Sequence, residues 1–195
     1  MATAQNIVLS VPNLLTYGRI ASIPLIVACL YAQDHVWLWV AVAIYIAAAV
    51  TDFLDGYLAR AWSQQSSLGK MLDPIADKLL VGAVLLMLAA SGTITGFSLI
   101  PAIIILSREI LVSGLREYLG QMNLSVPVST LAKWKTTVQL IALGVLIAGP
   151  AGEAILPGTL AAGLALLWLA ALLTVWTGYD YVRAGIAHLV AADRS

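Results

Sequence analysis

The chain has 195 residues, of which 61% are hydrophobic and only 10% are charged, and its mean hydropathy is +0.94. A soluble globular domain carries about one quarter charged residues, so this composition excludes that class and indicates an integral membrane protein with one compact domain. Acidic and basic residues are equal in number, at 10 each, which leaves no basic surface for binding nucleic acid. The single cysteine, Cys29, excludes an internal disulfide.

Six apolar segments are long enough to cross a bilayer as helices. Each span needs about 20 largely apolar residues. Polar residues, glycine or proline separate the segments, for example at Gln33-Asp34-His35 and at Gly149-Pro150-Ala151-Gly152. The expected fold is therefore all-α, a six-helix transmembrane bundle. Its predicted helices cover residues 14–32, 36–59, 74–91, 98–118, 133–149 and 158–178.

Lysine and arginine occur in only some of the predicted loops. The loops near residues 33–35, 91–97 and 149–158 contain neither, whereas the other two loops and the C-terminal tail contain several. Basic loops are retained in the cytoplasm when a protein inserts into the membrane. We therefore expect both termini and both basic loops to lie on the cytoplasmic side, with a bacterial inner membrane as the location.

Four aspartates form two pairs next to one of the basic loops. Asp52 and Asp55 lie near the end of the second predicted helix, and Asp73 and Asp77 lie at the start of the third. At about 100° per residue, the members of each pair share one face of a helix. Facing carboxylates repel one another unless cations lie between them, so the pattern predicts bound divalent metal. The alternative, four unrelated acids in a loop, is disfavoured because charge at membrane depth is costly and usually functional.

The spacing of these aspartates resembles the signature of the CDP-alcohol phosphotransferase family. That signature is D-x-x-D-G-x-x-A-R, then eight residues, then G-x-x-x-D-x-x-x-D, and the chain matches it at every fixed position. Members of the family transfer a substituted phosphate from a CDP-linked lipid or alcohol to a hydroxyl group and release CMP. The matching residues are Asp52, Asp55, Gly56, Ala59, Arg60, Gly69, Asp73 and Asp77.

The resemblance implies a homodimer and an active site with two divalent cations, Mg²⁺ or Mn²⁺. We expect a single domain over residues 1–195, and the distribution of lysine and arginine puts the active site on the cytoplasmic side. The resemblance makes the four aspartates metal ligands and Asp77 also the candidate general base. Gly56, Ala59, Arg60 and Gly69 would lie against the nucleotide. The glycines and the alanine could equally serve helix packing, and Arg60 could anchor the chain at the membrane interface.

A basic group lies on the fourth predicted helix and at the start of the fifth. Arg108 lies about ten residues inside its span, so it requires a polar cavity and an anionic partner. Together with Arg116, Lys133 and Lys135 it could bind a phosphate dianion. The alternative is that these cations pair with neighbouring glutamates or extend to lipid head groups. If both lysines are helical they point to opposite faces, so only one of the two would contact a substrate.

Three further segments resemble one branch of the family. They are residues 12–19, 107–117 and 133–139. In that branch the donor is CDP-diacylglycerol, the acceptor is sn-glycerol 3-phosphate, and the products are phosphatidylglycerol phosphate and CMP, in phospholipid biosynthesis. Other acceptors stay open, namely serine, inositol phosphate, choline, or phosphatidylglycerol in cardiolipin synthesis. A function of a different class, divalent-cation transport, also stays open.

Overall fold

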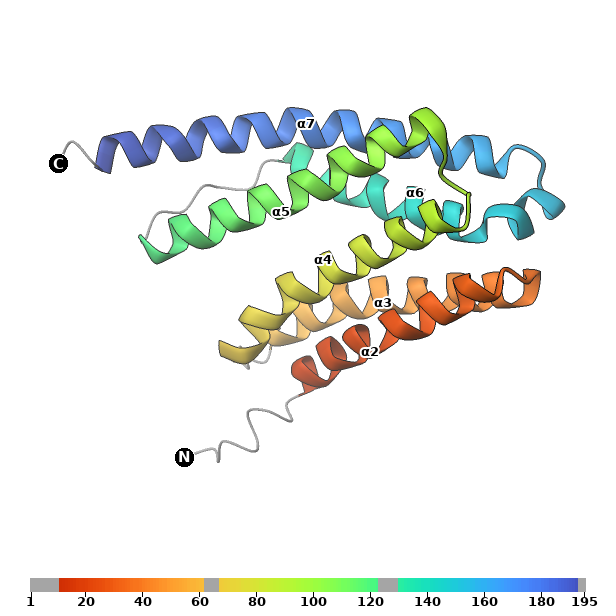
Figure 1. Cartoon of the computed structure of the whole chain (residues 1–195). Coiled ribbons are helices and arrows are strands. Elements are labelled where there is room, and N and C mark those ends of the chain that lie inside the picture. The colour runs from red at the N-terminus through yellow and green to blue at the C-terminus, as the bar shows by residue number, and fades with distance from the viewer. Residues whose placement is uncertain (1–10, 62–66, 123–129, 193–195) are drawn as a thin grey trace. The chain divides into compact units, whose positions relative to one another are not determined.

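The structure is a computed structural model that describes the backbone of residues 11–61, 67–122 and 130–192, with the side chains of residues 55–61 and 187–192 and of a few single positions left out. The described backbone is helical apart from short connections (Figure 1). Its elements are α2 (Val11–Ala32), α3 (His35–Ala61), α4 (Ser67–Ala90), the short 3-10 helix η1 (Gly96–Ser98), α5 (Leu99–Gln121), α6 (Thr130–Ile155) and α7 (Thr159–Ala192).

Five of the described helices are long and apolar enough to cross a membrane. The qualifying stretches lie in α2, α3, α5, α6 and α7. The exception is α4, which carries the charged residues Asp73, Asp77 and Lys78 in its first half. The prediction of an all-α membrane protein with six α-helices is confirmed for the described ranges. Length and composition by themselves support five membrane spans.

Two helices start or end in places that the apolar pattern did not indicate. α4 begins at Ser67 instead of residue 74, so Pro74 lies inside the helix and not in its first turn. α7 continues to Ala192 instead of ending near residue 178. Polar residues such as Asp180 interrupt an apolar run without interrupting a helix, because a helix that leaves the membrane needs no apolar side chains.

The predicted break at Gly149 is present, but the helix resumes after it. Gly149 has the non-helical dihedral angles φ 41° and ψ −121°. Glycine tolerates this positive φ because it lacks a Cβ atom. Pro150 can then begin a new helical segment, since its missing N–H would have had no partner at that position. The chain therefore stays helical to Ile155, past the predicted end at residue 149.

The chain divides into two compact units. Unit 1 comprises Met1–Thr93 and Gly144–Leu160, and unit 2 comprises Ile94–Leu143 and Ala161–Ser195. In unit 1, α2 packs against both α3 and α4, so it adjoins both helices that carry the aspartates. The buried side chains of these three helices are mostly aliphatic and include Ile26, Leu30, Ala41, Leu80, Val84 and Leu88.

In unit 2, α7 approaches α5 closely at two glycines. A Cβ atom at Gly178 would lie 3.2 Å from Cγ of Arg108, and one at Gly185 would lie 3.1 Å from Cδ2 of Leu115. Small residues allow helix backbones to approach in membrane proteins. Gly178 thereby leaves room for the long side chain of Arg108 inside the unit.

Candidate active site

The three signature aspartates with described side chains all contact α2. Nη1 of Arg19 lies 2.7 Å from Oδ1 of Asp52 and 3.7 Å from Oδ1 of Asp77. The hydroxyl of Thr16 donates a hydrogen bond of 2.6 Å to Oδ1 of Asp73. One helix therefore binds carboxylates from both α3 and α4. We call Arg19, Asp52 and Asp77 the acidic trio.

Burial is distributed unevenly within the acidic trio. The side chain of Arg19 is fully buried, whereas those of Asp52 and Asp77 are 40% and 51% exposed. A buried guanidinium requires an anionic partner, because removing an unpaired charge from water is costly. Arg19 therefore holds the two carboxylates from the interior of the unit and leaves them partly open to solvent.

The residues of α2 that reach the aspartates follow a simple sequence pattern. Asn13, Thr16 and Arg19 are three residues apart, so they lie along one face of the helix, and all three are buried. In the sequence this segment carried only a family resemblance, and no partner was predicted for Arg19. The signal that could have identified it is a charged residue inside an otherwise apolar helix, which needs a counter-ion.

The donor atoms suit a hard divalent cation, which prefers carboxylate oxygens. Among the described side chains, no three His, Cys, Asp or Glu residues lie together closely enough to hold a metal ion. Each described aspartate of the signature instead contacts α2, and the side chain of Asp55 lies outside the description.

The other signature residues lie on the same two helices. Gly69 is buried in the first turn of α4. Gly56, Ala59 and Arg60 belong to the last turns of α3, and their side chains lie outside the described part of the chain. Their predicted contacts with a nucleotide therefore stay predictions.

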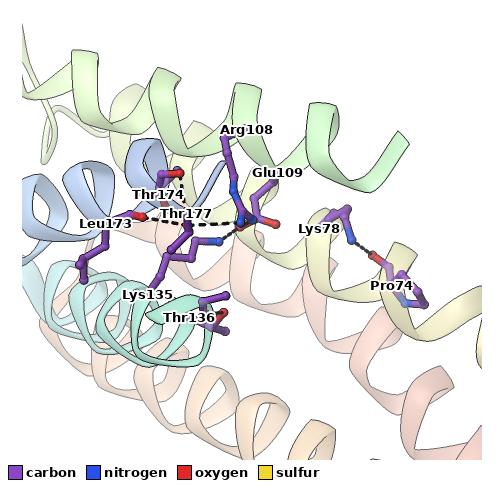
Figure 2. A network of polar contacts seen from close by, with 10 residues as sticks. Pro74, Lys78, Arg108, Glu109, Lys135, Thr136, Leu173, Thr174 and Thr177 are labelled. Atoms are coloured by element: carbon purple, nitrogen blue, oxygen red, sulfur yellow. Dashed lines mark hydrogen bonds and ion pairs between the residues drawn. The ribbon is translucent and has the colours of Figure 1, made fainter. Parts of the chain in front are cut away.

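A second polar cluster occupies unit 2 (Figure 2). Arg108 and Glu109 come from α5, and Lys135 comes from α6. Nζ of Lys135 forms an ion pair and a hydrogen bond with Oε1 of Glu109, and Nη1 of Arg108 lies 3.7 Å from the same oxygen. We call these three residues the basic trio. Their side chains are largely buried, with 17%, 16% and 3% of the surface exposed for Arg108, Glu109 and Lys135.

Thr177 of α7 completes the surroundings of Arg108. Its hydroxyl donates to the carbonyl oxygen of Leu173 at 2.8 Å and accepts a bond of 3.4 Å from Nη2 of Arg108 (Figure 2). The hydroxyl proton of Thr177 is used in the hydrogen bond to its own helix, so the hydroxyl oxygen keeps a lone pair that can accept a bond from Arg108. The alternative interpretation, in which the cations pair with a neighbouring glutamate, therefore holds for Arg108 and Lys135 through Glu109. Thr177 is a partner that was not predicted.

The other two predicted cations lie in more open positions. The guanidinium of Arg116 lies 5.6 Å from the ring centre of Tyr181, which is a cation–π distance. Lys133 is exposed, whereas Lys135 is buried. The structure therefore joins Arg108 and Lys135 through Glu109 and leaves Lys133 on the surface of the unit.

Several buried polar atoms of unit 2 have no hydrogen-bond partner among the described residues. They are Nε of Arg108, Oε1 of Gln139 and Oγ1 of Thr174. Gln139 follows Lys135 by one helical turn, and Thr174 precedes Thr177 by one turn, so these atoms belong to the same helix faces as the cluster. Buried polar groups almost always have partners. Water or a polar ligand is therefore the expected neighbour of these atoms.

Comparison with known proteins agrees with the resemblance carried by the aspartates. The family model described as CDP-alcohol phosphatidyltransferase matches residues 9–176 of this chain. That region contains both trios.

Similar proteins align over most of the chain. The CDP-diacylglycerol–glycerol-3-phosphate 3-phosphatidyltransferase of Rickettsia bellii is 47% identical, over 90% of this chain and 94% of that protein. The protein of the same name from Cereibacter sphaeroides is 38% identical, over 92% of this chain and 97% of that protein. A cardiolipin synthase (CMP-forming) from Oryza sativa is 38% identical, over 90% of this chain and 57% of that protein. The chain therefore belongs to the CDP-alcohol phosphatidyltransferase family.

Proposed function

We propose that the chain transfers the phosphatidyl group of CDP-diacylglycerol to the primary hydroxyl of sn-glycerol 3-phosphate, which yields phosphatidylglycerol phosphate and CMP. One observation carries the proposal: bacterial relatives named for this reaction align with at least 90% of the chain and 94% of their own length. Membership of a transferase family also favours an enzyme over the cation transporter that the sequence left open.

On the donor side, the four signature aspartates are the proposed ligands of two divalent cations, Mg²⁺ or Mn²⁺. When bound, such cations neutralise the pyrophosphate of the donor and stabilise the departing CMP. The partial exposure of Asp52 and Asp77 supports this assignment, because their carboxylates are open to a ligand while Arg19 holds them from within. Gly56, Ala59, Arg60 and Gly69 are the proposed nucleotide contacts.

Asp77 is the proposed general base. Its side chain is 51% exposed, so a carboxylate oxygen can accept the proton of an acceptor hydroxyl that approaches from solvent. Arg19 restricts the positions that this carboxylate can take, since the two groups form an ion pair. Orientation of the base before the reaction lowers the entropic part of the barrier.

On the acceptor side, Arg108 and Lys135 are the proposed main phosphate contacts, with Arg116 and Lys133 as the outer members. The basic trio carries one net positive charge, since Glu109 offsets only one of its two cations. A guanidinium offers several donors in a planar fork that matches phosphate oxygens. The buried atoms of Gln139 and Thr174 that have no described partner supply further polar groups for the glycerol hydroxyls.

An acceptor screen tests the reaction directly. The purified protein would be incubated with CDP-diacylglycerol, Mg²⁺ and one acceptor at a time, and CMP release would be measured. We expect CMP with glycerol 3-phosphate and none above background with serine, inositol phosphate or choline. The likeness to the cardiolipin synthase of Oryza sativa makes phosphatidylglycerol the second candidate acceptor. CMP release with phosphatidylglycerol alone would reject the proposed acceptor and retain the family.

We further propose a single domain over residues 1–195 with six spans, both termini and the active site in the cytoplasm, and a homodimer in the bacterial inner membrane. Cysteines at Asp34 or Thr95 in a Cys29→Ser background should react with an impermeant thiol reagent added to intact cells. A cysteine at Met122 should react only in inverted membrane vesicles. Labelling of Asp34 and Met122 from one side would refute this topology.

Light scattering of the purified protein in detergent tests the proposed homodimer.

A further inference from the structure

We propose that Arg19 is a positioning residue that competes with divalent cations for the carboxylates of Asp52 and Asp77. In the metal-free protein, its buried guanidinium takes over part of the charge compensation that metal provides in the loaded enzyme. This inference rests on the proposed metal-dependent function. It adds a role for a residue outside the aspartate signature.

Arg19 contacts two carboxylates that are proposed metal ligands. It contacts carboxylates from two different helices, at 2.7 Å on α3 and 3.7 Å on α4. Its side chain is fully buried while both carboxylates are partly exposed. A guanidinium on the inner side and a dication on the outer side would therefore act on the same two carboxylates.

The charges determine the sign of the coupling between Arg19 and metal. The four signature aspartates carry four negative charges, and Arg19 offsets one of them. Without metal, the loss of Arg19 leaves the repulsion among the carboxylates less compensated, so stability should fall. With metal bound, the dications compensate the carboxylates even when Arg19 is absent. The variant also lacks the positive charge of Arg19, which repels the dications and weakens their binding. Binding is reciprocal in free energy, so a residue that weakens metal binding contributes less stability when metal is present.

Thr16 provides a matched control on the same face of α2. It donates a hydrogen bond to Asp73 one helical turn before Arg19, and it carries no charge. Thr16→Val therefore removes a contact to the third aspartate without changing the electrostatic balance. Arg19→Lys is the second control, because it keeps the positive charge while changing the number and arrangement of the donors.

The experiment measures thermal unfolding of the purified full chain in detergent, in chelator and in Mn²⁺, and Mn²⁺ binding by electron paramagnetic resonance. We expect Arg19→Gln to lower Tm more in chelator than in Mn²⁺ and to tighten Mn²⁺ binding on the order of 10-fold. Thr16→Val should lower Tm equally in both conditions, and Arg19→Lys should keep the wild-type response to Mn²⁺. An Arg19→Gln response to Mn²⁺ equal to or smaller than that of the wild type would overturn the inference.

A second variant covers the case in which Arg19→Gln does not fold. The double variant Arg19→Gln/Asp52→Asn removes one charge of each sign, so it should be more stable in chelator than the single variant. Equal instability of the two would show that Arg19 serves packing alone and would overturn the inference. If the wild-type protein bound no Mn²⁺, the proposed metal function would fall, and this inference with it. If the wild type bound Mn²⁺ and the Arg19 variants bound it with the same affinity, the proposed metal function would stand and only the role of Arg19 would be rejected.

Discussion

The acidic trio of unit 1 and the basic trio of unit 2 compensate their charges in opposite ways. In the acidic trio, one cation contacts two carboxylates. In the basic trio, one carboxylate contacts two cations. Each trio keeps one net charge, negative in the first and positive in the second. The sign of that charge is opposite to that of the proposed ligand, a metal cation for the acidic trio and a phosphate for the basic trio.

The comparison shows how a membrane protein can keep charged groups ordered without losing its attraction for a ligand. Full compensation would remove that attraction, and no compensation would leave buried charges at a high energetic cost. The two trios differ in the exposure of their side chains. The two carboxylates of the acidic trio are about half exposed, whereas all three side chains of the basic trio are largely buried. The exposure of the two carboxylates agrees with the proposed large donor bearing a nucleotide, and the burial of the basic trio agrees with the proposed small anion.

The largest expected effect follows from removing charge from the acidic site. Asp52→Asn or Asp73→Asn should lower CMP release by at least about 10³-fold, because each change removes a negative oxygen required to hold a dication. The measurement is CMP release from CDP-diacylglycerol at saturating Mg²⁺, with helicity checked by circular dichroism. Asp180→Asn on the exposed surface of α7 is the matched control and should keep the wild-type rate. Near-normal turnover of both site variants would contradict the metal assignment.

Asp77→Asn should separate base chemistry from metal binding within the acidic trio. If Asp77 accepts the acceptor proton, kcat should fall by roughly 10²–10⁴-fold while CMP binding is retained. Steady-state kinetics and calorimetric CMP titration measure the two quantities. A parallel loss of CMP and Mn²⁺ binding would make Asp77 only a metal ligand.

In the basic trio, loss of a cation should affect one substrate selectively. Arg108→Gln or Lys135→Gln should raise the KM for glycerol 3-phosphate by roughly 10–100-fold, since a charge-assisted contact contributes about 1.5–3 kcal/mol. The KM for CDP-diacylglycerol should change little. Lys133→Gln removes an outer cation of the same helix, and the exposure of Lys133 predicts a smaller change, of less than about 5-fold. Equal effects on both substrates would place these cations at the donor site or in the fold.

The smallest effect is expected from the counter-ion of the basic trio. Glu109→Gln removes the negative charge that contacts both buried cations, so Tm should fall in buffer free of phosphate and recover when inorganic phosphate is added. The apparent Kd for phosphate should fall by about 5-fold because one competing negative charge is gone. Thermal unfolding across a phosphate titration measures both. If the variant and the wild type responded identically, the analogy between Arg19 and Glu109 would be wrong.

Much of the fold could be predicted because the membrane permits few alternatives. About 20 consecutive apolar residues form a helix there, since any other backbone leaves polar groups without partners in lipid. The six α-helices of the described residues and the break at Gly149 could therefore be predicted from the chain. The start of α4 at Ser67 and the extension of α7 to Ala192 could not, because the backbone hydrogen bonds of a helix continue through polar residues that end an apolar run.

The candidate site divides in the same way between sequence and tertiary structure. The signature of four aspartates with two glycines, an alanine and an arginine indicated the family, because eight fixed positions rarely coincide by chance. Helical periodicity also separated Lys133 from Lys135, since residues two apart point to different faces.

Tertiary structure decided which partner each charge has. Thr16 and Asp73 are 57 residues apart in the chain, and Lys135 and Glu109 are 26 apart. Periodicity assigns a side chain to a face of its own helix, but the packing of helices determines which faces meet. The ion pairs of Arg19 depend on the packing of α2 against α3 and α4. The burial of Lys135 beside Glu109 depends on the packing of α6 against α5.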